Sequence, residues 1–383
     1  MSQSLRVPSE SDFSARLRSP ELAARIGLVL GLCFGVAFVT GLVSHAAQEP
    51  SWPFPSRPVW AYRVNQGLHL ASGTAAVPLL LVKLWAVYPK LFTRPPRPSR
   101  ELVLHLAERV SIGVLVAAAI FQLATGLANS AQWYPWNFSF RATHFAIGWV
   151  AVGALLVHIA VKLPIIRAAL QGPLGQEGRA AGPDRSALTR RGLLRTTWVA
   201  AGLAVLATAG STVPVLRRVS VLGVRSGDGP GGIPINKTAR AAGVTASATS
   251  AAYRLTVSHG ELEIVLTQQE LAALRRHTEE LPIACVEGWS ASGAWTGVRV
   301  RTLIDLVDAP RGSAVRVVSL QERGPFRAIE LPGNFADDPL TLLATELSGQ
   351  PLSLDHGYPC RLIAPNRPGV LQTKWVTRLE VLT

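Results

Sequence analysis

The sequence has few cysteines and few charged residues. Its three cysteines, Cys33, Cys285 and Cys360, are too few and too scattered for a disulfide framework or a four-ligand zinc site. One of them can still act as a single metal ligand or nucleophile. Charged residues make up only 16% of the chain and hydrophobic residues 48%, which argues against a soluble globular protein. We therefore searched the sequence for membrane-spanning segments.

Five apolar runs are long enough to cross a bilayer as helices, at a rise of about 1.5 Å per residue. The expected spans lie near residues 24–45, 68–89, 108–129, 144–166 and 194–216.

The net charge of +14 is concentrated in three of the segments that flank these runs. Lysine and arginine gather in the N-terminal segment, after the second run, and between the fourth and fifth runs. These residues are Arg6, Arg16, Arg18, Arg25; Lys90, Arg94, Arg97, Arg100; and Lys162, Arg167, Arg179, Arg185, Arg190, Arg191, Arg195. The other loops hold only Arg57, Arg63 and Arg141. The positive-inside rule then predicts a cytoplasmic N-terminus and an extracytoplasmic C-terminus, and nucleic-acid binding loses its main support.

The C-terminal part changes character from Tyr253 onward. The runs YRLTV, LEIVL, VRVVSL, CRLIA and RLEVL are typical of short strands, and LTQQELAALRRH predicts a helix capped by Thr267 with Glu270 three residues later. The expected organisation is a cytoplasmic segment, a four-helix membrane domain, a loop with a fifth span, a linker or cofactor arm, and a mixed domain. Their ranges are 1–23, 24–166, 167–216, 217–252 and 253–383.

Histidines in or beside the apolar runs are candidate cofactor ligands, because ionisable residues at membrane depth are costly. His144 and His158 are 14 residues apart on one predicted helix. This spacing separates them by about 21 Å and about 40° in azimuth, as two stacked haems require. Topology puts His69 at the depth of His144 and His105 at the depth of His158. We therefore expect two six-coordinate haem ligand pairs, His69 with His144 and His105 with His158.

The alternatives stay open at this point. His45 is another candidate for the outer ligand, and histidines at span ends can also be interfacial residues without a haem. The runs GLHLASGTAAVPLLLVKLWAVYPKLF and YPWNFSFRATHFAIGWVAVGALLVHIAVKLP resemble bacterial b-type cytochrome membrane domains, over roughly residues 24–166. The resemblance implies haem b, one or two per chain, whereas the alternative is a haem-free anchor.

Two further segments, in the same order as in the family, resemble the sulfite-oxidase family of molybdopterin enzymes. PIACVEGWSASGAWTGVRVRTLIDL is similar to the molybdenum-ligand segment, and DHGYPCRLIAPNRPGVLQTKWVTRLEV to the pterin-binding segment. The resemblance implies an α+β fold of the sulfite-oxidase type and a molybdenum–molybdopterin cofactor. It gives Cys285 the role of the single thiolate ligand of molybdenum. Cys360 matches an ordinary apolar strand position.

The same resemblance implies further site residues. His356, Arg361 and Lys374 match positions that hold the pterin and its phosphate, and Asn236 lies in a segment that is either a linker or a cofactor-contacting arm. If the segment is extended, Glu287 points to the same side as Cys285. It is then either a proton donor near the metal or a structural hydrogen-bond acceptor.

The stretch TRRGLLR before the fifth run resembles the twin-arginine export consensus. Thr189, Arg190 and Arg191 are followed by Leu193 and Leu194, although positive-inside topology also produces an arginine pair before a span. A molybdopterin domain folds around its cofactor in the cytoplasm, which implies a partnership with the twin-arginine export machinery.

These observations predict a multi-pass inner-membrane oxidoreductase with its catalytic domain on the periplasmic or extracellular side. Its expected partners are membrane lipid, quinone or quinol, and a small-molecule or protein S- or N-oxide. CVEGW resembles bacterial reductases of the family, such as the methionine-sulfoxide reductase with a separate haem subunit, and an arginine cluster for sulfite is not evident. Two alternatives remain: a sulfite-type dehydrogenase that delivers electrons to quinone, and a non-catalytic redox sensor or scaffold.

Overall fold

The computed structural model describes residues 17–93, 96, 100–172, 189–209, 212, 216, 218–223 and 232–382. The chain separates into two compact units. A helical unit takes its residues from Met1–Gly41 and Leu68–Thr208, and a mixed unit from Leu42–Gly67 and Ala209–Thr383. Several basic residues assigned to cytoplasmic segments lie outside the described residues: Arg6, Arg16, Arg94, Arg97, Arg179 and Arg185.

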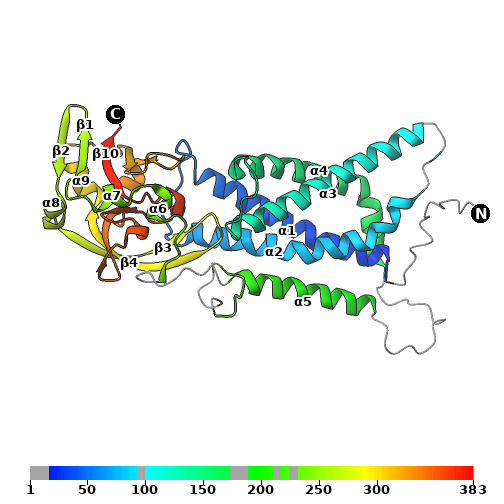
Figure 1. Ribbon diagram of the computed structural model, residues 1–383. Coiled ribbons are helices and arrows are strands. Elements are labelled where there is room, and N and C mark those ends of the chain that lie inside the picture. Colours follow the sequence, from blue (N-terminus) through cyan, green and yellow to red (C-terminus); the bar gives the residue numbers. More distant parts are fainter. Residues whose placement is uncertain are drawn as a thin grey trace, which may run out of the picture. The chain divides into compact units, whose positions relative to one another are not determined.

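Four helices are long and apolar enough to cross a membrane, within the part of the chain that the structure describes. They run alongside one another in Figure 1 and match the first four predicted spans, although each begins before the predicted residue. Their bounds are α1 Pro20–Ala46, α2 Ala61–Val87 continued by the 3₁₀ helix η2 Tyr88–Phe92, α3 Arg100–Ser130 and α4 Phe140–Gln171.

The fifth predicted span, 194–216, is helical where the structure describes most of it. Helix α5 covers Arg190–Ala209. Most residues from 210 to 216 lie outside the described residues. At the start of α5 the Thr189 hydroxyl accepts a hydrogen bond from the Gly192 N–H at 3.0 Å. Helix α5 carries three arginines in its first six residues, and it is not among the helices that are long and apolar enough to cross a membrane in the described part of the chain. Its crossing of a membrane stays a prediction.

The helical unit is packed on the inside and apolar on the outside. Leu22 and Ile26 of α1, Leu79 of α2 and Leu194 of α5 belong to one buried cluster. Several large apolar side chains elsewhere on these helices are more than half exposed, for example Leu32 at 66%. An apolar exterior of this kind is typical of a surface that faces lipid.

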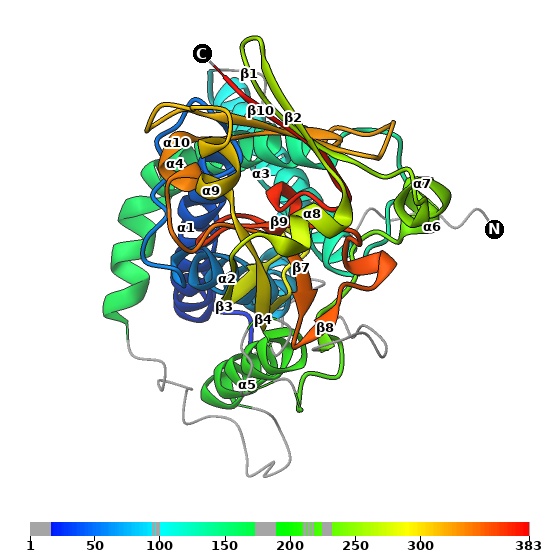
Figure 2. The ribbon, with the colours of Figure 1, turned by 90° about the vertical axis from the view of Figure 1, so that its left-hand side faces the viewer.

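The mixed unit contains two five-stranded sheets. The first has the order β2-β1-β10-β5-β6, in which β1 and β10 are parallel neighbours that lie side by side in Figure 2. The second has the order β3-β4-β7-β8, with β9 also paired to β7. The strands are β1 Leu255–His259, β2 Leu262–Leu266, β3 Arg276–Ala284, β4 Ser290–Arg299, β5 Val315–Ser319, β6 Ala328–Leu331, β7 Leu342–Leu347, β8 Gln350–Pro351, β9 Arg361–Ile363 and β10 Val376–Val381.

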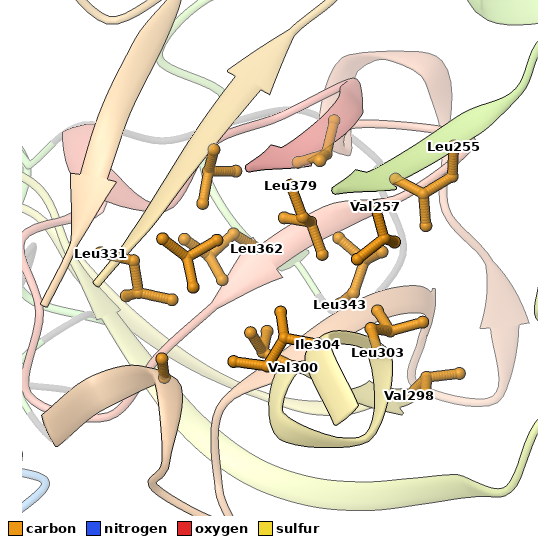
Figure 3. Packing of buried hydrophobic residues seen from close by; sticks show 14 of the residues in the cluster. Leu255, Val257, Val298, Val300, Leu303, Ile304, Leu331, Leu343, Leu362 and Leu379 are labelled. Atoms are coloured by element: carbon orange, nitrogen blue, oxygen red, sulfur yellow. The ribbon is translucent and has the colours of Figure 1, made fainter. Parts of the chain in front are cut away.

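Apolar side chains from both sheets and from helix α9 (Val300–Asp305) form the main core of this unit. Figure 3 shows Val257 and Leu379 from the first sheet, Leu343 and Leu362 from the second, and Leu303 from α9 converging on one cluster. All five are fully buried. Burial of such side chains stabilises the fold by about 1.5–3 kcal/mol each relative to exposure.

The remaining short elements of the mixed unit are helices. They are α6 Ala239–Ala242, α7 Thr245–Thr249, α8 Gln268–Ala273, α10 Gly333–Ala336, η5 Leu354–His356 and η6 Gly369–Leu371. Helix α8 has the predicted capping box, with Thr267 and Glu270 hydrogen-bonded reciprocally. Helices α6 and α7 lie in the expected linker, yet Ala239 and Ala248 pack in one cluster with Trp375. The second part of that linker is therefore built into the mixed unit.

Candidate functional site

Cys285 lies in the tight turn between β3 and β4. Its N–H donates to the Trp289 carbonyl at 2.8 Å, and its carbonyl accepts from the Gly288 N–H at 3.1 Å. Gly288 has a φ of 86°, in the left-handed region that favours glycine. The turn holds the Cys285 side chain in a buried position, with only 1% of the residue exposed.

The Glu287 carboxylate lies beside the Cys285 thiol, but the two residues belong to a turn and not to the extended segment that the prediction assumed. Glu287 Oε2 lies 3.5 Å from Cys285 Sγ and accepts a hydrogen bond from Trp289 Nε1–H at 3.0 Å. Burial, followed by the Glu287 charge, raises the pKa of the Cys285 thiol well above its ordinary value. A bound metal ion reverses this effect, because it favours the thiolate form of its ligand.

A pocket with three cationic side chains lies among the segments named by the pterin-binding resemblance. Arg361 and Lys374, which are expected to hold the pterin, line it together with Lys237 and with Asn236 from the expected cofactor arm. Burial lowers the pKa of Arg361 to about 10. Burial and the Arg361 charge lower that of Lys374 to about 7. Since buried cations are stable only when paired, the pocket is suited to an anionic group such as a phosphate.

Several buried polar atoms at this pocket have no hydrogen-bond partner within the described protein. They are Arg361 Nε, Gln372 Oε1 and Thr373 Oγ1, and all three residues line the pocket. Buried donors and acceptors without a partner fit a site for a polar ligand, which would form the missing hydrogen bonds. Gly369, another lining residue, approaches Ala284 so closely that an added Cβ would lie 3.2 Å from the Ala284 carbonyl. The pocket wall therefore adjoins the residue before Cys285.

His356 lies beside the pocket residues, but both of its ring nitrogens have partners in the protein. Nε2 donates to the Ile233 carbonyl at 2.9 Å, and Nδ1 accepts from the Ser353 hydroxyl at 2.8 Å. The His356 carbonyl in turn accepts from Arg361 Nη1 at 3.2 Å. In this structure His356 orients Arg361 and the segment at Ile233, and its predicted contact with the pterin remains a prediction.

The other two cysteines have no comparable surroundings. Cys360 is fully buried in the main core, where its Sγ lies 3.1 Å from the Tyr253 hydroxyl, and burial raises its pKa to about 12. Cys33 is half-buried against the apolar cluster of the helical unit. Both positions are typical of packing cysteines.

In the helical unit, the structure brings together the first of the two predicted histidine pairs. The rings of His69 on α2 and His144 on α4 have centroids 6.4 Å apart. Two imidazoles that bind one metal ion from opposite sides, with metal–nitrogen bonds of about 2.0–2.1 Å, have centroids about 6 Å apart. The separation therefore suits a metal ion between the two rings.

Hydrogen bonds fix which nitrogen each ring presents. His69 Nδ1 lies 2.9 Å from the Ala37 carbonyl, which can only accept. His144 Nδ1 lies 3.0 Å from the Thr125 hydroxyl, whose own proton is donated to the Phe121 carbonyl. Both Nδ1 atoms are therefore donors, which leaves both Nε2 atoms unprotonated, as a metal ligand must be.

No direct contact joins the second pair among the described residues, and its role as a haem ligand pair stays a prediction. His105 Nε2 accepts a hydrogen bond from Arg109 Nε at 2.8 Å. His105 and His158 both lie near Glu108, and His158 also lies near Lys83 and Lys162. His45, the alternative outer ligand, lies 3.9 Å from the Glu49 carboxylate one turn along the chain.

Two residues near the site were not found from the sequence. Lys237 adds the third cation of the pocket, next to the proposed Asn236. Gln66, far away in the sequence, donates from Nε2 to the Cys285 carbonyl at 3.2 Å. The resemblance to known segments does not cover either contact, and no local pattern marks a glutamine that bonds a residue more than 200 positions away.

Comparisons with known proteins identify the C-terminal part of the chain. Residues 242–383 match the family model of the oxidoreductase molybdopterin binding domain. The protein-methionine-sulfoxide reductase catalytic subunit MsrP of Xanthomonas axonopodis pv. citri is 34% identical over 111 residues, or 26% of this chain and 34% of that protein. Sulfite oxidase of Arabidopsis thaliana is 29% identical over 113 residues, or 25% and 29%.

A third relative is the putative protein-methionine-sulfoxide reductase subunit YedZ1 of Azospira oryzae. It is 31% identical over 115 residues, which cover 30% of this chain and 43% of that protein. The chain thus spans less than half the length of each of these relatives. Each of them matches only a part of this chain.

Proposed function

We propose that this chain, which carries a molybdopterin-binding oxidoreductase domain of the sulfite-oxidase family, is a membrane-anchored reductase fed with electrons through b haem. Membrane quinol is the electron source, and an extracytoplasmic S- or N-oxide is the substrate. The observation that carries the proposal is the His69–His144 pair, because its spacing supports a haem site on the same chain as the molybdopterin domain. The relatives named as catalytic and YedZ1 subunits of methionine-sulfoxide reductases support the substrate class.

The residues of the molybdopterin domain have separate tasks in this proposal. Cys285 would hold molybdenum through its single thiolate, and Arg361, Lys374 and Lys237 would hold the phosphate of the pterin. When bound, the cofactor supplies two-electron oxygen-atom transfer. Reduction of a sulfoxide to a thioether and water consumes two electrons and two protons, and the Glu287 carboxylate beside Cys285 can carry a proton to the site.

Export follows the twin-arginine route in this proposal. The pair Arg190 and Arg191 opens α5, and Thr189 caps that helix. The positive-inside rule supports a cytoplasmic N-terminus and an extracytoplasmic molybdopterin domain. Helix α5 would remain in the membrane as an uncleaved anchor.

A redox difference spectrum of the purified, detergent-solubilised protein tests the reductase. The dithionite-reduced protein should show a b-type α-band, and methionine sulfoxide or another S- or N-oxide should re-oxidise it. Cys285→Ser should abolish the re-oxidation and leave the band intact. Absence of the band in the wild-type protein would refute the electron-transfer role of the helical unit.

The sulfite oxidases among the relatives favour a second candidate, a dehydrogenase that delivers electrons to quinone. The same spectra separate the two directions of electron flow. If sulfite reduces the oxidised haem and the S- and N-oxides do nothing, the enzyme is a dehydrogenase.

A further inference from the structure

The segment between α1 and α2, residues 42–67, belongs to the mixed unit together with the molybdopterin domain. We call it the outer segment. The Arg57 guanidinium donates to both carboxylate oxygens of Asp338, from Nη2 at 2.9 Å and from Nε at 3.2 Å. The Asn366 side chain accepts from the Tyr62 N–H at 2.6 Å and donates to the Pro55 carbonyl at 2.8 Å. These bidentate contacts bind the outer segment to the domain in a defined register.

The end of the outer segment contacts the turn that carries Cys285. Gln66 is 5% exposed, and its Nε2 donates to the Cys285 carbonyl at 3.2 Å. Tyr62, one helical turn earlier on the same face of α2, is 1% exposed and packs against Ala284. Cys285, the residue expected to bind molybdenum, thus accepts a hydrogen bond from Gln66. Gln66 precedes the molybdopterin domain by more than 150 residues.

The orientation of the Gln66 amide is determined by its second contact. Gln66 Oε1 accepts from the Ser44 hydroxyl at 2.7 Å, and that hydroxyl oxygen accepts from Asn65 Nδ2 at 2.8 Å. Because the oxygen of the amide faces a donor, its NH₂ group faces the Cys285 carbonyl, which can only accept. Three side chains of the outer segment therefore cooperate to present one donor to Cys285.

We propose that Gln66 is a positioning residue for Cys285, the expected thiolate ligand of molybdenum. Its amide donor holds the Cys285 carbonyl and, through it, the turn that carries the thiol. This inference rests on the proposed function only for the haem re-oxidation that its test measures.

Gln66→Leu tests the proposal in the full-length, cofactor-loaded protein, with Gln48→Leu as the matched control. Gln48 is in the same outer segment, and its Nε2 donates to the Ser44 carbonyl, one turn back. Gln66→Leu should change the electron paramagnetic resonance spectrum of Mo(V). It should also slow re-oxidation of the haem by methionine sulfoxide by about tenfold or more, the range seen for residues that orient metal ligands. Gln48→Leu should match the wild type in both measurements.

Gln66→Glu keeps the size of the side chain and serves as the second variant if Gln66→Leu does not fold. A glutamate removes the donor to the Cys285 carbonyl, so the same spectral change and slowing are expected. Unchanged Mo(V) spectra and unchanged re-oxidation rates in either folded variant would overturn the proposal. The Mo(V) spectrum does not depend on the haem. A change in it therefore supports the positioning role of Gln66 even if the wild-type haem proves inactive with every oxidant, in which case the proposed function fails separately.

Discussion

The imidazole rings of His69 and His144 lie in an edge arrangement, with centroids 6.4 Å apart and planes inclined by 69°. Each ring comes from a different helix, and each Nδ1 is held by a hydrogen bond, so the pair is oriented by the protein alone. Gly41 and Gly126 lie beside the two rings, where an added Cβ would be 3.3 and 3.7 Å from the respective Cε1 atoms. Preorganised ligands of this kind bind a metal without rearrangement of the helices.

Replacement of His144 should therefore remove the haem. His144→Leu deletes one of the two proposed axial ligands and keeps an apolar side chain at this position of α4, so the folded protein should lose the b-type α-band that the proposal expects. The pyridine haemochrome assay on purified protein measures haem per chain. A normal haem content in His144→Leu would exclude the His69–His144 site.

His105→Leu should leave the haem content unchanged. The hydrogen bond from Arg109 Nε occupies His105 Nε2, and no described contact joins His105 to His158. The same haemochrome assay distinguishes the outcomes, since a second haem ligated by His105 would make the variant lose about half of its haem. Such a loss would restore the two-haem arrangement expected from the spacing of His144 and His158.

Cys285 and Cys360 provide a matched pair of substitutions in one domain. Cys285→Ser should abolish turnover with S- and N-oxides, because serine does not replace the thiolate expected to bind molybdenum. Cys360→Ala should keep turnover and destabilise the protein by about 1 kcal/mol through loss of a buried sulfur. Activity assays and thermal unfolding of both variants check these outcomes. Normal turnover in Cys285→Ser would contradict the ligand assignment.

The sequence predicted those parts of the fold that depend on local pattern. The apolar runs predicted the first four long helices, and the capping pair Thr267 and Glu270 predicted the start of α8. That helix ends at Ala273, earlier than the pattern indicated, because Arg276 and His277 pair with β4 as part of β3. Tertiary strand pairing overrides local propensity in such cases.

The candidate site was predictable where a motif or a helical spacing carried it. Cys285, Glu287, Arg361 and Lys374 lie in recognisable segments, and the pairing of His69 with His144 followed from membrane depth. The role of the outer segment was not predictable. Its contacts join residues that are more than 200 positions apart, and such long-range hydrogen bonds leave no periodic signal in one sequence.

Lys374 should make the stability of the cofactor-free protein depend on pH. Burial lowers its pKa to about 7, whereas an unfolded lysine has a pKa of about 10.4. Between these values the unfolded state binds more protons, so the free energy of unfolding should rise with pH, by at most about 1.4 kcal/mol per pH unit from this group. Below about pH 7 both states are protonated, and Lys374 contributes no slope.

Thermal unfolding of the cofactor-free protein between pH 7 and 10 measures this slope. Lys374→Met should flatten the curve, because methionine has a similar length and does not titrate. Bound cofactor should also flatten it, since a phosphate next to Lys374 raises the lysine pKa towards its ordinary value. Equal slopes in the wild type and in Lys374→Met would show that Lys374 is not the titrating group.

The twin-arginine hypothesis makes a prediction that membrane topology alone does not. Replacing Arg190 and Arg191 together by lysine preserves the positive charge at the start of α5, so the positive-inside rule predicts an unchanged orientation. Recognition by the twin-arginine machinery requires the arginines themselves, so export of the folded domain should fail. Protease accessibility of a C-terminal tag in spheroplasts reports the location of the domain, with Arg195→Lys as a control on the same helix. A tag that remains accessible in the double variant would contradict twin-arginine export. The positive-inside rule alone would then explain the arginine pair.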